Sequence, residues 1–123
     1  VTYPPGMETL VYGSSTLLLL NSMIGRADSS REHVGSNFRK FPEVFNLHNF
    51  EAPQSQRRPE VYLEVDELAD LILIRSIWSH FEALKGENEY FSLDEILEFC
   101  ELNHELTQSN MHVVRRWRSV IES

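Results

Sequence analysis

Cysteine and basic residues are the scarce components of this 123-residue sequence. Its single cysteine, Cys100, excludes an internal disulfide framework and any zinc site built from cysteines. Lys and Arg number 11 against 19 Asp and Glu, so the formal net charge is −8. This negative balance argues against nucleic acid and anionic membranes as partners, because both carry dense negative charge.

Long apolar runs are also missing. No purely aliphatic run is longer than Leu17–Leu20, which is far shorter than the roughly 20 residues of a transmembrane helix. Apolar residues nevertheless make up 41% of the chain, which is enough to build a core. Together with the lone cysteine, this composition predicts a single globular domain over residues 1–123 in the reducing cytoplasm.

Three short segments have the character of β-strands. In the clearest of them, Val61, Leu63 and Val65 alternate with other residues and would share one face of a sheet. The predicted strands are Thr9–Tyr12, Phe45–Phe50 and Val61–Val65.

Five segments have the character of helices. The most regular places apolar residues at helical spacing over Glu67–Leu84 and stops at Gly86. Capping boxes are predicted at Ser29 with Glu32 and at Ser92 with Glu95. The predicted helices are Thr16–Ile24, Arg31–Arg39, Glu67–Leu84, Ser92–Asn103 and Asn110–Ile121.

This order of strands and helices predicts an α/β fold. Three strands are few for a sheet that carries helices on both faces, so further strands are expected upstream. The sequence begins at Val1 rather than Met, which leaves a processed N-terminus or the C-terminal part of a longer chain. The strand count favours the second interpretation.

Asp66 closes the clearest strand just before a helix. In open α/β sheets ligands bind beyond the carboxyl ends of the strands, where a carboxylate can hold Mg²⁺ against a nucleotide phosphate. Asp is also a preferred N-cap, so Asp66 can equally serve to cap the helix from Glu67. Both roles stay open.

Three consecutive residues, Arg31, Glu32 and His33, have side chains that commonly bind substrates or transfer protons. Arg31 suits an anionic group of a substrate, and His33 suits a hydrogen-bond donor or proton carrier. The alternative is an exposed, capped helix terminus with no ligand. Cys100 lies on the apolar side of its helix and is therefore expected in the core. No adjacent basic group supports a reactive thiolate.

Six segments, taken in order, carry a resemblance to a known family. They are Tyr3-Pro4-Pro5-Gly6-Met7-Glu8, Arg31-Glu32-His33-Val34, Phe41-Pro42-Glu43-Val44-Phe45 and Val65-Asp66-Glu67-Leu68-Ala69-Asp70-Leu71, followed by 91–97 and 110–113. Together they resemble the cytidylyltransferases that make CMP-sugars (acylneuraminate and Kdo type), most strongly the spore-coat polysaccharide biosynthesis branch. The resemblance implies the C-terminal half of a nucleotide-diphospho-sugar-transferase-like (Rossmann-like) α/β domain, in which helices flank a mixed sheet. It also implies a homodimer.

The resemblance also implies roles for individual residues. Asp66 would bind Mg²⁺, and the acidic sugar would lie against Gly6, Met7, Glu8, Arg31, Glu32 and His33. The family joins CTP to a sugar hydroxyl and releases pyrophosphate, here for surface polysaccharide biosynthesis. Its CTP-cradling loop belongs to the N-terminal half, so this segment contains no catalytic residue of its own and is expected to be inactive without that half.

A non-catalytic protein-interaction module derived from the same fold is the alternative. Leu10 stands where the family has an acidic residue, and Glu67-Leu68 stands where it has Thr-Pro. Such changes are what the loss of catalysis would permit. On this interpretation the partner is another protein chain.

Overall fold

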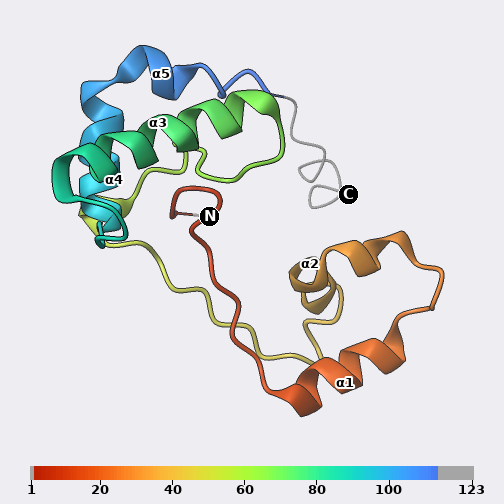
Figure 1. Ribbon diagram of the computed structural model, residues 1–123. Helices are drawn as coiled ribbons and strands as arrows, with labels where there is room; N and C mark the ends of the chain where they lie inside the picture. Colours follow the sequence, from red (N-terminus) through yellow and green to blue (C-terminus); the bar gives the residue numbers. More distant parts are fainter. Residues whose placement is uncertain (1, 114–123) are drawn as a thin grey trace. The chain divides into compact units, whose positions relative to one another are not determined.

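The computed structural model describes residues 2–113, which form two compact units. The large unit comprises residues 2–8 and 51–113, and the small unit comprises residues 9–50. Figure 1 labels the helices of both. Each unit has its own hydrophobic core and is described by itself.

The large unit is built from three α-helices and one 3₁₀-helix. Their bounds are η2 Gln54–Gln56, α3 Leu68–Lys85, α4 Leu93–Leu102 and α5 His104–Gln108. Helix α3, green in Figure 1, is the longest, and α4 follows it through a short turn. The core joins both helices to an extended segment and consists of Val61, Leu63, Leu73, Ile77, Phe81, Leu97, Phe99 and Cys100.

Several predictions for this unit are confirmed. The helix predicted over Glu67–Leu84 corresponds to α3, and Gly86 ends it with a φ of +106°. Cys100 lies in the core, where burial raises the pKa of its thiol. Helix α5 was not predicted, because its five residues carry no apolar period.

The predicted capping box at the start of α4 is also present. Ser92 Oγ accepts a hydrogen bond from Glu95 N, and Glu95 Oε2 accepts one from Ser92 N at 2.9 Å. Glu95 Oε1 also lies 2.5 Å from Lys85 Nζ at the end of α3. The hydrogen bond from Lys85, with those from Ser92, lowers the pKa of Glu95 from 4.5 to about 2.

These contacts predict a pH dependence for the large unit. A carboxyl whose pKa is lowered by folding stabilises the folded state above its unfolded pKa, and that contribution is lost as the pH falls. For Glu95 the loss spans pH 4.5 to about 2. We expect Glu95→Gln, which keeps the capping box, to unfold with a weaker pH dependence than the wild type in this window. Parallel pH dependences in urea melts would contradict the assignment.

The small unit contains α1 Ser14–Met23, a 3₁₀-helix η1 Ser29–Glu32 and a short α2 Val34–Phe38. Its core is Leu20, Phe38 and Phe45, with the two phenylalanine rings in an edge contact at 5.0 Å. Helix α1 confirms the helix predicted over Thr16–Ile24. The helix predicted over Arg31–Arg39 is wrong as one element, because the chain is divided at His33 into η1 and α2. The predicted cap is also wrong: Asp28, and not Ser29, caps η1, since its side chain accepts a hydrogen bond from Ser30 N.

The predicted α/β mixed sheet is wrong, because residues 2–113 contain helices and no strand. Val61 and Leu63 are buried as predicted, but Tyr62 is buried with them and Val65 is exposed, so the predicted alternation of faces is absent. Helices α3 and α4 cover the buried residues. Leu63 N donates to Pro5 O at 2.8 Å, and Tyr62 O accepts from Asn110 Nδ2 at 3.0 Å. The neighbouring Pro4-Pro5 has no N–H groups to donate in return, so a strand ladder cannot form there.

The other two predicted strands are irregular chain in the small unit. Val11 is 92% exposed and Phe50 is 85% exposed, whereas Phe45 is buried, so no alternating face exists in either segment. In the helix predicted over residues 110–121, residues 110–113 instead form turns and a bend, and the rest lies outside the described residues. Within residues 2–113, no helix has both the length and the apolar character of a membrane span.

Candidate functional site

Asp66 lies exposed on the turn that leads into α3. Its backbone N–H donates to Asp70 Oδ2 at 3.1 Å, and Glu67 rather than Asp66 occupies the N-cap position. The alternative role of Asp66 as the helix cap is therefore wrong. The structure leaves its carboxylate at the surface.

Asp70 is the carboxylate that organises this turn, and the sequence analysis did not single it out. It is fully buried, and Oδ2 accepts hydrogen bonds from the N–H groups of Asp66 and Glu67 at 3.1 and 2.9 Å. Oδ1 accepts from Asn110 Nδ2 at 2.9 Å. The available signal was its position three residues after Glu67, which is the acidic position of a capping box.

The residues around Asp66 do not fit the Mg²⁺ that the resemblance implies. The nearest buried carboxylate, Asp70, already accepts three hydrogen bonds from the protein. In the part of the chain that the structure describes, no group of three or more His, Cys, Asp or Glu side chains is placed to hold a metal ion. Mg²⁺ binding here stays a prediction from the resemblance.

Gly6, Met7 and Glu8 form a tight turn at the start of the large unit. Gly6 has a φ of +97°, and a Cβ at this position would lie 2.5 Å from Glu64 N. Its N–H donates to Glu8 Oε2 at 2.7 Å. Met7 and Glu8 are exposed. Close backbone approach thus accounts for the glycine without a ligand.

Arg31 binds the end of α1. Its Nη1 donates to Asn21 Oδ1 at 2.8 Å, Nη2 to Ile24 O at 2.8 Å, and Nε to Gly25 O at 2.9 Å. A guanidinium suits this position because it satisfies carbonyl groups that a helix C-terminus leaves unpaired. Neighbouring Glu32 is exposed and His33 is half-buried at the break between η1 and α2.

Arg31→Ala is expected to lower the free energy of unfolding of the small unit by about 2 kcal/mol, since several hydrogen bonds from a charged donor are lost. Arg31→Lys should recover only part of this loss, because a single ammonium cannot reproduce the planar fork. Faster amide hydrogen exchange in α1 measures the effect. Arg26→Ala, at an exposed position nearby, is the matched control, and equal exchange in both variants would contradict the role.

The predicted sugar-side residues and Asp66 are divided between the two units. The large unit contains Gly6, Met7, Glu8 and Asp66, and the small unit contains Arg31, Glu32 and His33. Neither unit holds the whole predicted site. Gly6 and Arg31 both have contacts within the protein that explain their presence.

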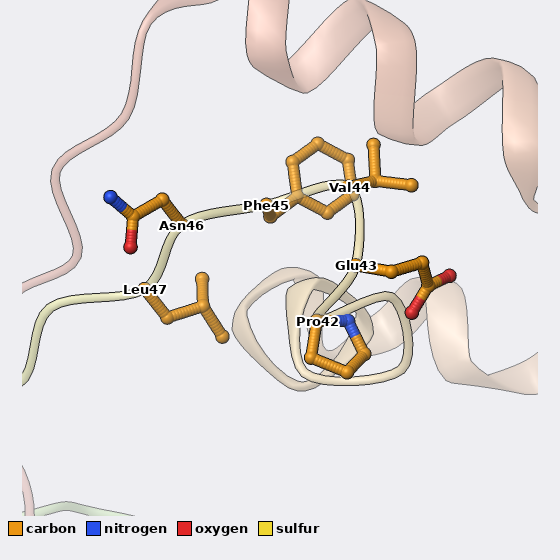
Figure 2. Close-up of a pocket in the computed structure, with 6 residues that line it drawn as sticks. All are labelled: Pro42, Glu43, Val44, Phe45, Asn46 and Leu47. Atoms are coloured by element: carbon orange, nitrogen blue, oxygen red, sulfur yellow. The ribbon is translucent and has the colours of Figure 1, made fainter.

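An open hollow of about 430 Å³ lies on the small unit (Figure 2). A single continuous bend of chain, residues 42–47, lines it. Glu43 is the one ionisable side chain among these six residues, and Phe45 is buried in the core. One carboxylate without a second titratable group gives no acid–base pair, so the hollow offers no basis for catalysis.

Helix α3 presents apolar side chains away from the core. Leu68 is 69% exposed, Ile72 is 48% exposed and Trp78 is 52% exposed, while Leu71 between them is half-buried. Leu68, Leu71 and Ile72 are three or four residues apart, so they are neighbours on the helix surface. Trp78 lies two turns after Leu71 on the same side of the helix, and the exposed Arg75 stands between them. We call Leu68, Leu71, Ile72 and Trp78 the α3 stripe. The edge of Phe91 supports the Trp78 ring, with centroids 5.7 Å apart.

Charge is distributed unevenly between the two units. The described residues of the large unit include 15 Asp and Glu but only four Lys and Arg, whereas residues 9–50 include three acidic and four basic residues. Exposed carboxylates stand at both ends of the α3 stripe: Asp66 and Glu67 before it and Glu82 one turn after Trp78. The exposed Arg75 is the one Lys or Arg between these ends, so the stripe is an apolar surface with acidic ends and one positive charge near its middle.

Comparison with known proteins identifies no relative that could assign these features. The candidate surface accordingly rests on the described geometry alone. No protein-family model matches the chain, and no curated protein or solved structure matches it.

Proposed function

We propose that the chain is a non-catalytic protein-interaction module whose α3 stripe binds a helix of a partner protein. The observation that carries the proposal is the exposure of Leu68, Ile72 and Trp78 on one rigid helix. The opposite face of α3 is anchored in the core through Leu73, Ile77 and Phe81, so the stripe is held in a fixed orientation. A fixed row of apolar side chains at helical spacing suits helix-on-helix recognition.

The energetics of covering this stripe are adequate for recognition. Full burial of a large apolar side chain contributes about 1.5–3 kcal/mol, and association subtracts the cost of lost freedom. A tryptophan at one end adds an anchor of the kind that dominates binding energies. Several partly exposed side chains together thus supply a moderate affinity.

Cross-linking from the stripe tests the proposal. A photo-reactive amino acid replaces Ile72 in the chain expressed in its own cells, and the control replaces Glu98, which is exposed on α4. We expect one discrete protein adduct from position 72 and none from position 98. Leu68→Ser should abolish that adduct, whereas Leu102→Ser, at an exposed α4 position, should not. No adduct, or the same adduct from both positions, would contradict the proposal.

The cytidylyltransferase activity implied by the resemblance stays a prediction. Arg31 and Gly6 already have contacts within the protein, and Asp66 belongs to no cluster of metal-binding groups in the described residues. These observations lend that activity no support. Its direct test is calorimetric titration of the chain with CTP and Mg²⁺, in which binding lost in Asp66→Ala would favour the enzyme.

A cytoplasmic setting is part of the proposal. It is supported by the one cysteine of the sequence, which is buried as a free thiol. Microscopy of the tagged protein in its own cells tests it, and a signal outside the cytoplasm would overturn it.

A further inference from the structure

We propose that the segment bound by the α3 stripe is a basic amphipathic helix. This inference rests on the proposed function of the stripe and specifies the chemistry of its partner. The apolar face of such a helix would cover Leu68, Ile72 and Trp78, and its Lys and Arg side chains would face the carboxylates at the two ends.

The spacing of the charges defines the partner. Asp66 and Glu67 adjoin Leu68 at one end, and Glu82 lies four residues after Trp78 at the other. Fourteen residues of helix separate Leu68 from Glu82, which corresponds to about 21 Å. The partner helix is therefore expected to carry basic residues about four turns apart, with apolar residues between them.

Other occupants fit the charges less well. Nucleic acid and anionic lipid would be repelled by a unit whose described residues hold 15 acidic and four basic side chains. A second copy packed antiparallel through the same stripe would bring Asp66 and Glu67 of one chain toward Glu82 of the other. Such juxtaposition of like charges is unfavourable, so the stripe favours a partner of opposite charge.

Two peptides test the proposal on the full chain. Both have the 18-residue length of α3 and the same leucine face, and their polar positions are all Lys in one and all Glu in the other. Fluorescence anisotropy of the labelled peptides measures binding. We expect the Lys peptide to bind at least about tenfold more tightly than the Glu peptide, and its affinity to fall between about 50 mM and about 500 mM salt.

Matched variants separate this inference from the proposed function. We expect Leu68→Ser with Ile72→Ser to abolish binding of the Lys peptide, and Asp66→Asn with Glu82→Gln to weaken it. The controls Leu102→Ser and Glu98→Gln on α4 should leave it unchanged.

Each contrary result has a distinct meaning. If both peptides bind alike and only the serine variants weaken them, the stripe is a docking surface but its basic partner is refuted. If neither peptide binds, or if the serine variants leave Lys-peptide binding intact, the stripe itself is refuted as the docking surface.

Discussion

Replacing Asp70 by alanine is expected to lower the free energy of unfolding of the large unit by about 3–5 kcal/mol. The substitution removes the acceptor for the N–H groups of Asp66 and Glu67 and for Asn110 Nδ2. Asn110 is fully buried, so the N–H that it gives to Asp70 cannot turn to water, although Asn110 Nδ2 keeps its bond to Tyr62 O. The loss of an acceptor for this N–H costs about 1–3 kcal/mol, and the two hydrogen bonds lost at the exposed turn add about 0.5–1.5 kcal/mol each.

Urea unfolding, with amide hydrogen exchange of α3 to assign the effect to the large unit, measures this loss. Asp70→Asn keeps the shape and one acceptor oxygen, so a smaller loss is expected. Asp66→Ala is the matched control, because it removes an exposed carboxylate from the same turn, and it should change the free energy by less than about 0.5 kcal/mol. Equal losses in the alanine variants would show that Asp70 does not organise this turn.

Gly6→Ala is expected to destabilise the large unit by about 2–4 kcal/mol, since strained backbone alone costs about 1–3 kcal/mol and a clash is added to it. The clash is with backbone: a Cβ would lie 2.5 Å from Glu64 N and 2.6 Å from Leu63 C. The segment around Leu63 cannot retreat freely, because Leu63 packs in the core and its N–H donates to Pro5 O.

Alanine substitutions at two other glycines separate the cost of backbone strain from the cost of the clash. Gly86 has a φ of +106° but meets only the Glu89 side chain at 3.8 Å, so Gly86→Ala reports the backbone strain alone. Gly25 has neither a positive φ nor a neighbour within 4 Å, so Gly25→Ala should be neutral or slightly stabilising. For the large unit, the melting temperature of Gly6→Ala is expected to lie below that of Gly86→Ala. Gly25→Ala should leave the melting of the small unit unchanged or slightly raised. A Gly6→Ala melting temperature at or above that of Gly86→Ala would refute the close approach.

Helices α1, α3 and α4 were predictable because their signals are local. Glu67–Leu84 has apolar residues at helical spacing, and Ser92 with Glu95 is a complete capping box in four residues. The sheet prediction failed for a non-local reason. Alternation in Val61–Val65 correctly indicates that Val61 and Leu63 are buried, but it fails for Tyr62, which is also buried, and for Val65, which is exposed. It also does not specify whether strands or helices cover the buried side chains. The neighbouring segment that could have paired with it contains Pro4-Pro5, which cannot complete a ladder.

The roles of the candidate site residues likewise depend on contacts that the local sequence does not indicate. The sequence around Arg31 suits an anion, yet the guanidinium donates to acceptors six to ten residues earlier, which are Gly25 O, Ile24 O and Asn21 Oδ1. Asp70 stands at the acidic position of a capping box, but nothing local indicates its burial, which is explained by Asn110, a partner 40 residues away. Pairings of this kind depend on the tertiary fold, which the local pattern does not encode.

The large unit is discontinuous in the chain, with residues 9–50 inserted between its two parts. Its first part is held by contacts from far ahead: Ala52 N donates to Thr2 Oγ1, and Leu63 N donates to Pro5 O. At a synthesis rate of about 5–20 residues per second, several seconds pass between the synthesis of residues 2–8 and the synthesis of these hydrogen-bond partners. The described part of the small unit, residues 9–50, has been made by residue 50, so it is the first part that can fold during synthesis. The large unit is completed only afterwards.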